Sequence, residues 1–335
     1  MGPVNDVSLT ISFRYDEEIY HMIFLLTMKT MLHLLAFIIL GYLLCRFHLI
    51  GEKMQKFISD LVATVLIAVL VFNAIYFHFS AEKINETLIF VALYLGGAAI
   101  MLLLSFLFAK KQGLPGGQSG SLLAGCFLIN VGYIGLPVIQ DLPIGKNAVL
   151  YAGASIILVN LLLGFLAEPF IRHFAGVRRR ERRSLWKALL SPSLIGFLCG
   201  MTVYFLKMPL PGFLREGLEL TGACIAPLAM VVIGCKLFSC EWKEIFGDKK
   251  LYLICLTRML IFPVAVFLPA CLICRDATML TSFAILISCP PLLILPIFAD
   301  RYSGDGQWCT RFVFLSTLMS MFTIPLVLLI IGFII

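Results

Sequence analysis

The sequence contains little charge. Asp, Glu, Lys and Arg together make up 13% of its 335 residues, whereas hydrophobic residues make up 61%. Soluble globular domains carry about 25% charged residues, so this composition excludes a soluble globule. The first twenty residues are polar and acidic, without a basic start followed by a short apolar core, and we expect no cleavable signal peptide. The chain is predicted to be a polytopic membrane protein.

Signatures of enzymes and metal sites are also missing. The chain contains no H-E-x-x-H, no G-x-S-x-G and no phosphate-binding glycine loop. Most of the eleven cysteines lie in apolar stretches, where they act as small hydrophobic residues. The pair Cys271 and Cys274 has the C-x-x-C spacing but no second pair or histidine to complete a metal site. We therefore expect no enzymatic activity and no resident metal or other cofactor.

Carboxylates are absent from the middle of the apolar stretches. Asp60, Asp141 and Glu168 all lie at the edges of such stretches. Carriers driven by Na⁺ or H⁺ commonly bury an acid near the transported substrate. The sequence therefore favours transport driven by the substrate gradient and the membrane potential. Coupling to Na⁺ or H⁺ stays open, because unwound backbone carbonyls can also hold Na⁺.

Ten apolar stretches are long enough to cross a bilayer, which takes about 20 residues in a helix. They lie at about 22–45, 57–79, 87–109, 119–140, 146–168, 189–207, 217–238, 250–272, 277–299 and 311–334. Five stretches precede the longest polar connection and five follow it. The predicted organisation is a tail at 1–21, a first five-helix repeat at 22–170, a basic linker at 171–188 and a second five-helix repeat at 189–335.

The distribution of Lys and Arg predicts the orientation in the membrane. Basic residues concentrate in cytoplasmic loops, and the linker is the most basic connection. It carries Arg172, Arg178, Arg179, Arg180, Arg182, Arg183 and Lys187. With the linker inside, about eighteen basic residues face the cytoplasm and about six face outward. We expect a multi-pass protein of the cell membrane with both termini extracellular, and we interpret the arginine cluster as a topology signal rather than a nucleic-acid site.

The fourth and ninth stretches are interrupted near their middle by glycine and proline. The residues concerned are Asn130, Gly132, Gly135 and Pro137 in the fourth stretch, and Pro290, Pro291 and Pro296 in the ninth. Proline removes a backbone donor and clashes with the preceding turn, so we predict helix breaks at Pro137, Pro290 and Pro296. Hydrocarbon tolerates unpaired backbone groups only where they are buried in protein or line a cavity. Matched broken helices in two halves indicate the substrate site of a secondary transporter.

The two halves are predicted to form an inverted repeat. Because each half has an odd number of stretches, a duplicated half must enter the membrane in the opposite orientation. Adding 159 to a residue number brings Pro137 to Pro296 and Leu32 to Ser191, at the start of the sixth stretch. The expected fold is therefore all-α, with ten transmembrane helices arranged as a 5+5 inverted repeat.

Several motifs resemble the auxin efflux carrier family, whose bacterial members include malate- and malonate-type permeases. They include 41–59, Asn130-x-Gly-x-x-Gly-Leu-Pro137, Asn160 with Gly164, 227–234, Ala299-Asp-Arg-Tyr302 and Ser316-Thr317. The resemblance implies a fold like that of sodium/proton antiporters and bile-acid transporters, in which helices 4 and 9 cross at their breaks. It also implies a scaffold of spans 1, 2, 6 and 7, a moving transport domain of spans 3–5 and 8–10, and a substrate-site role for Asn130.

A broken helix can bind an anion at the start of its second half, where unpaired amides carry a partial positive charge. The amide of Asn130 can donate to a carboxylate at the same place. Arg258 lies deep in the eighth stretch, either contacting the substrate or anchoring the broken helices through their carbonyls. The candidate substrate-binding residues are Asn130, Gly132, Gly135, Pro137, Asn160, Arg258, Pro290, Pro291 and Ile294.

These observations favour a secondary transporter that moves a small organic anion by alternating access, with an elevator-type motion. The residues 292–295 are apolar where bacterial relatives tend to have small and polar side chains, which favours a monocarboxylate with a hydrophobic body over malate. The expected partners are an organic acid, the bilayer and a second copy bound through the scaffold helices, with no nucleic acid. The alternatives are a sodium- or proton-coupled carrier of the same fold, a membrane sensor and an intramembrane enzyme.

Overall fold

The computed structural model describes residues 17–78, 81–144, 146–176, 192–238, 247–302 and 304–332, and nearly all of them are helical. Residues 1–16 of the expected tail and most of the expected linker lie outside this part of the chain. Each of the ten predicted apolar stretches corresponds to one helix or to a series of consecutive helices. Apolar residues favour helices in a membrane because a helix satisfies its backbone hydrogen bonds internally.

The first half contains the helices up to α8. They are α1 (Glu17–Arg46), α2 (Glu52–Leu61), η1 (Val62–Leu66), α3 (Ile67–His78), η2 (Ala81–Lys83), α4 (Ile84–Lys111), α5 (Gly116–Phe127), η3 (Val131–Gly135), α6 (Leu136–Asp141), α7 (Lys146–Phe165) and α8 (Ala167–Phe174). Arg172, expected in the linker, lies in the last turn of α8.

The second half begins at α10. Its helices are α10 (Pro192–Phe205), α11 (Gly212–Ala223), α12 (Ile225–Phe238), α14 (Lys249–Leu256), η4 (Thr257–Ile261), α15 (Phe262–Ile273), α16 (Ala277–Ser288), α17 (Leu295–Arg301) and α18 (Gly306–Gly332). In the part of the chain that the structure describes, six continuous helical segments are long and apolar enough to span a membrane, and three apolar helices are shorter.

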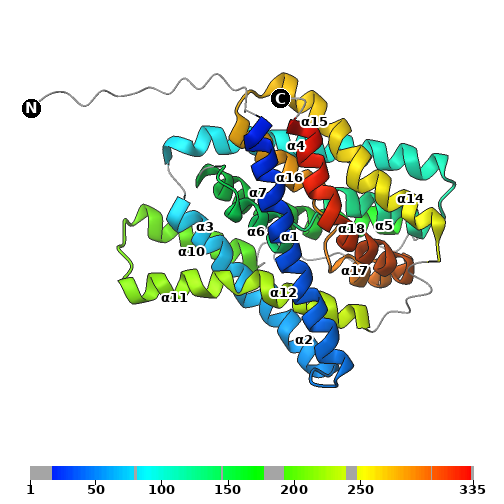
Figure 1. The fold of residues 1–335 in the computed structure, drawn as a ribbon, viewed down its shortest axis with the longest axis horizontal. Helices are drawn as coiled ribbons and strands as arrows, with labels where there is room; N and C mark the ends of the chain where they lie inside the picture. Colours follow the sequence, from blue (N-terminus) through cyan, green and yellow to red (C-terminus); the bar gives the residue numbers. More distant parts are fainter. Residues whose placement is uncertain are drawn as a thin grey trace, which may run out of the picture.

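Two sets of helices, which contact each other through α1 with α18 and α3 with α7, are named here as groups (Figure 1). The first helix group contains α1, α2, α3, α10, α11 and α12, and the second helix group contains α4–α8 and α14–α18. Within the first group, α1 packs along α12 and α3 packs along α10. Both pairs approach closely at glycine: a Cβ at Gly41 would collide with the backbone carbonyl of Val231, and a Cβ at Gly200 would lie 3.2 Å from the carbonyl oxygen of Phe72. Small residues allow such contacts between membrane helices.

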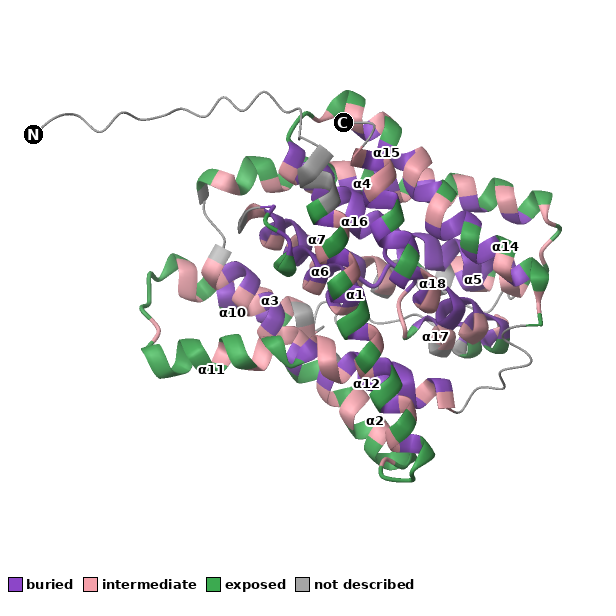
Figure 2. Ribbon diagram, viewed as in Figure 1, coloured by how far each residue is buried: buried purple, intermediate pink, exposed green. Residues whose placement is uncertain are grey.

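Burial is greatest in the second helix group (Figure 2). Residues 119–132 and 279–291 are buried without interruption, so protein surrounds the break of the fourth stretch and the first part of the break of the ninth. Ile294, at the end of the second break, is exposed. By contrast, most of α11 and one face of α1 are exposed. Large apolar side chains on these exposed faces are consistent with contact with lipid.

Both predicted interruptions are present. The fourth stretch is helical up to Phe127 and resumes at Val131, and the ninth is helical up to Ser288 and resumes at Leu295. Of the three prolines predicted to mark the breaks, Pro290 lies within one. Pro137 instead lies where the π-helix η3 passes without a gap into α6. Pro296 lies in the first turn of α17, where proline is compatible with a helix because that amide needs no intrahelical partner.

Candidate functional site

The two interrupted segments pair with each other through their backbones. The amide of Asn130 donates to the carbonyl of Pro290 at 2.8 Å, and the amide of Leu292 donates to the carbonyl of Leu128 at 2.8 Å. These bonds form an isolated antiparallel bridge between Ile129 and Pro291. Backbone groups released by one broken helix are thus satisfied by the other, which lets both breaks persist inside an apolar protein.

Arg258 lies behind this crossing and is completely buried. Its guanidinium donates from Nη1 to the carbonyl of Ile287 at 3.3 Å and from Nη2 to the carbonyl of Cys289 at 3.2 Å. These carbonyls belong to the last turn of α16 and the residue after it, where a helix leaves acceptors without intrahelical partners. Of the two roles considered for Arg258, the contacts are those of an anchor for the broken helix.

Asn130 caps the second half of the first broken helix. Its Oδ1 accepts a hydrogen bond from the amide of Tyr133 at 3.3 Å. The side chain is 1% exposed, and its Nδ2 has no hydrogen-bond partner among the described residues. A buried amide without a partner costs about 1–3 kcal/mol. The structure therefore contains a polar donor that a bound acceptor would satisfy.

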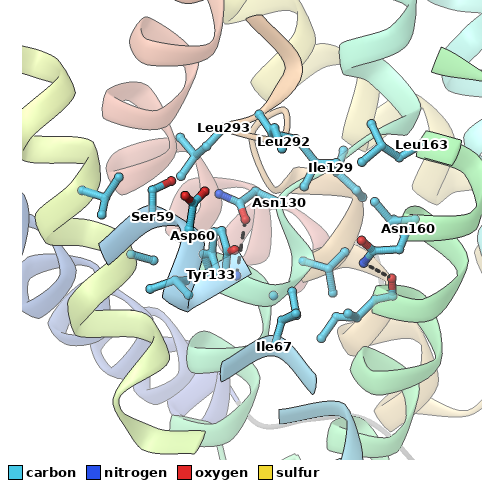
Figure 3. Close-up of a pocket in the computed structure, with 18 of the residues that line it drawn as sticks. Ser59, Asp60, Ile67, Ile129, Asn130, Tyr133, Asn160, Leu163, Leu292 and Leu293 are labelled. Atoms are coloured by element: carbon cyan, nitrogen blue, oxygen red, sulfur yellow. Dashed lines mark hydrogen bonds between the residues drawn. The ribbon is translucent and has the colours of Figure 1, made fainter. Parts of the chain in front are cut away.

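A cavity of about 220 Å³ lies against this amide (Figure 3). Apolar side chains from both broken segments and from neighbouring helices form most of its wall. The lining residues are Ser59, Asp60, Val62, Ile67, Ile129, Asn130, Val131, Gly132, Tyr133, Ile156, Val159, Asn160, Leu163, Ala229, Val232, Lys236, Leu292, Leu293 and Ile294. Both helix groups contribute to this wall, so relative movement of the groups would change the cavity.

Four of the predicted substrate-binding residues line the cavity: Asn130, Gly132, Asn160 and Ile294. Asn160 donates from Nδ2 to the carbonyl of Ile156 in its own helix at 2.8 Å. The other five predicted residues do not line the cavity. They are Gly135, Pro137, Arg258, Pro290 and Pro291. The two adjacent prolines lie in the backbone bridge, the arginine contacts carbonyls at the end of α16, and Gly135 and Pro137 follow in η3 and α6.

Two charged residues of the cavity were not predicted as site residues. Asp60 lies at the end of α2 and Lys236 lies in the last turn of α12. In the sequence both stand at the end of an apolar stretch, which is typical of residues at the membrane surface. Only the packing of α2 and α12 beside the crossing brings them to the cavity.

A second cavity lies on the other side of the crossing. It also measures about 220 Å³ and shares Gly132 with the first cavity. His33, Pro137 and Asp141 are among its lining residues. Thr30 of α1 donates to Oδ2 of Asp141, at the end of α6, at 2.6 Å, which joins the first helix group to the second beside this cavity. A further cavity of about 360 Å³ shares Leu70, Gln140 and Gly222 with this one, so hollow regions surround the paired breaks.

Paired broken helices beside internal cavities are a feature of secondary transporters. A family model described as "Membrane transport protein" matches residues 26–168 and 167–328, so the chain belongs to this family. The match confirms the resemblance to auxin efflux carriers. The chain is also 22% identical over 307 residues to a protein of Methanothermobacter thermautotrophicus described as "Uncharacterized transporter", an alignment that covers 91% of this chain and 98% of that protein.

Proposed function

We propose that the protein carries a small monocarboxylate with an apolar body across the cell membrane by alternating access. The observation that carries this proposal is the Nδ2 of Asn130, which is buried and unpartnered at the wall of a cavity. A carboxylate accepts strong hydrogen bonds and would supply the missing partner. The predicted role of Asn130 at the substrate site becomes, in this proposal, the recognition of the carboxylate.

The rest of the cavity supports an apolar body. Leu292, Leu293 and Ile294 come from one broken segment, while Ile67 and Ile156 come from neighbouring helices. Ligand sites commonly combine such apolar walls with a few polar groups that fix the orientation. A second carboxylate, as in malate, would have to be desolvated against these side chains, which is costly without a compensating partner. We therefore assign the head of the substrate to Asn130 and its body to the 292–294 segment.

The helix contacts support a ten-helix inverted repeat. With the offset of 159 residues, Gly41 corresponds to Gly200 and Val231 corresponds to Phe72. The close contact of Gly41 with the carbonyl of Val231 therefore corresponds to the contact of Gly200 with the carbonyl of Phe72. The contact is tighter at Gly41 than at Gly200, where the side chain of Ile75 is also close. Contacts of the same kind between α1 and α12 and between α10 and α3 are what a pseudo-two-fold axis in the membrane plane would produce.

We further propose that the first helix group is the scaffold and the second is the moving transport domain. Hydrogen bonds such as Asn73 to Leu218 lie within the first group, and those of Gln118 with Asp305 and of Lys250 with Gln112 lie within the second. An elevator-type motion would preserve these bonds and break the one between Thr30 and Asp141. Transport would be driven by the substrate gradient and the membrane potential.

Asp60 and Lys236 belong to elements whose nearest loops are predicted to be cytoplasmic. The cavity beside Asn130 would then open inward in this structure, with both termini extracellular and the 171–188 linker in the cytoplasm. The exposed apolar face of the scaffold, which includes Leu32, Ile39 and Phe213, is also where we place a contact with a second copy.

Counterflow in proteoliposomes tests the proposed function. Vesicles loaded with unlabelled phenylacetate should accumulate labelled phenylacetate, and isovalerate should compete with it better than malate does. Asn130→Ala should reduce this accumulation at least tenfold. Asn147→Ala is the matched control, because Asn147 bonds Lys83 away from the cavity. Equal accumulation by the two variants would refute the role of Asn130, and accumulation no greater than in protein-free vesicles would refute monocarboxylate transport.

A further inference from the structure

The cavity beside Asn130 contains an acid as well as an amide, although the proposed substrate is an anion. Among the described residues, Asp60 is the only acid in its lining, and it comes from α2 of the first helix group. Figure 3 shows its carboxylate and the amide nitrogen of Asn130 pointing toward one another. No hydrogen bond joins the two groups among the described residues. A carboxylate bound to Asn130 would therefore lie close to the carboxylate of Asp60.

We propose that Asp60 weakens substrate binding on one side of the membrane only, by competing with the substrate carboxylate for the amide of Asn130. This proposal rests on the proposed function. The two residues lie in different helix groups, Asp60 in the scaffold and Asn130 in the transport domain. Asp60 therefore faces the bound anion only while the cavity is open to the side of the membrane on which Asp60 lies. Movement of the transport domain carries Asn130 away from it.

Electrostatics gives the direction and the approximate size of this effect. Two carboxylates several ångströms apart repel each other, and the repulsion is strongest where water is partly excluded. Asp60 is exposed, so solvent screens part of its field. Other charged or titratable groups around it are Lys236 on α12, Tyr133 on η3 and Lys56 one turn earlier on α2. A screened repulsion of this kind corresponds to about a five- to tenfold change in affinity.

When no substrate is bound, the carboxylate of Asp60 would take the place of the substrate carboxylate as hydrogen-bond acceptor for Asn130. A buried amide such as Asn130 Nδ2 is costly to leave unsatisfied. In the empty carrier, Asp60 would accept a hydrogen bond from this amide when the two groups approach each other, whereas the bound substrate would displace Asp60. The residue therefore favours release of the anion at the Asp60 end and allows the empty site to persist.

The test compares transport from the two sides. The Michaelis constant for phenylacetate is measured in right-side-out and inside-out vesicles for the wild type, Asp60→Asn and Glu52→Gln. Glu52 is an exposed acid in the first turn of the same helix and does not line the cavity. Asp60→Asn should lower the constant about five- to tenfold from the Asp60 end and leave it unchanged from the other end, while Glu52→Gln should change neither.

Each outcome bears on one proposal. An Asp60→Asn constant unchanged from both ends, or lowered equally from both, overturns the one-sided competition but leaves the carrier function intact. A higher constant from the Asp60 end would show that Asp60 assists binding, as it would for a substrate carrying an ammonium group. Absence of saturable uptake by every variant from either side overturns the proposed function itself. Melting temperatures of the three proteins establish that each is folded.

Discussion

The contact between α1 and α12 gives a prediction whose size follows from the structure. A Cβ added at Gly41 would lie 2.8 Å from the carbonyl carbon of Val231, and it would come still closer to the oxygen. Carbon atoms in contact prefer about 3.5–4.0 Å, so the two helices would have to separate by about 1 Å. Neither neighbour can rotate away, because both are backbone atoms. Overpacking of this kind costs about 1–3 kcal/mol.

Gly41→Ala also stabilises the helix itself by up to about 1 kcal/mol, because alanine has the higher helix propensity. This gain must be subtracted from the cost of the collision. Gly96→Ala on α4 is the matched control, because it makes the same change in a helix and its Cβ would have nothing within 4 Å. The difference between the two variants isolates the collision. In thermal melts of the purified proteins, Gly41→Ala should therefore unfold at a lower temperature than Gly96→Ala. Equal melting temperatures would refute the close contact between α1 and α12.

Two further predictions concern single hydrogen bonds. Thr30→Val removes the hydrogen bond to Asp141 between the helix groups, so the amides of α6 should exchange hydrogen several-fold faster than in the wild type. Thr87→Val is the control, because it loses only a local bond to Lys83 and should leave this exchange unchanged. Equal exchange in the two variants would show that the bond to Asp141 does not restrain the groups. Arg258→Lys keeps the charge but loses the two guanidinium nitrogens that donate to the carbonyls of Ile287 and Cys289. The affinity for phenylacetate should therefore fall several-fold in titrations. An unchanged affinity would argue against anchoring.

The class of protein and the place of its breaks could be predicted from the sequence because both depend on local chemistry. Apolar stretches of about twenty residues need only be counted, and Pro290 cannot continue a helix that requires its amide. The prediction of the position of the first break was less accurate. The break lies at residues 128–130 rather than at Pro137, which instead follows the π-helical turn η3 inside the helix that resumes at Val131.

Contacts between distant segments could not be predicted in the same way. The carbonyl that accepts from Asn130 belongs to Pro290, 160 residues later, and nothing local to Asn130 specifies that partner. Asp60 and Lys236 have the sequence context of residues at the membrane surface, and only tertiary packing turns them toward the cavity. For Arg258 the sequence left two roles open. The contacts that favour anchoring depend on which carbonyls its guanidinium reaches in the folded chain, and nothing local to Arg258 specifies them.

The most direct test of the central claim is a structure of the protein with 4-bromophenylacetate, in which the bromine marks the apolar end of the ligand. We predict the carboxylate within hydrogen-bonding distance of Nδ2 of Asn130 and the bromine against Leu292, Leu293 and Ile294. A ligand with its carboxylate on Arg258, or one bound only in the second cavity beside Asp141, would contradict it.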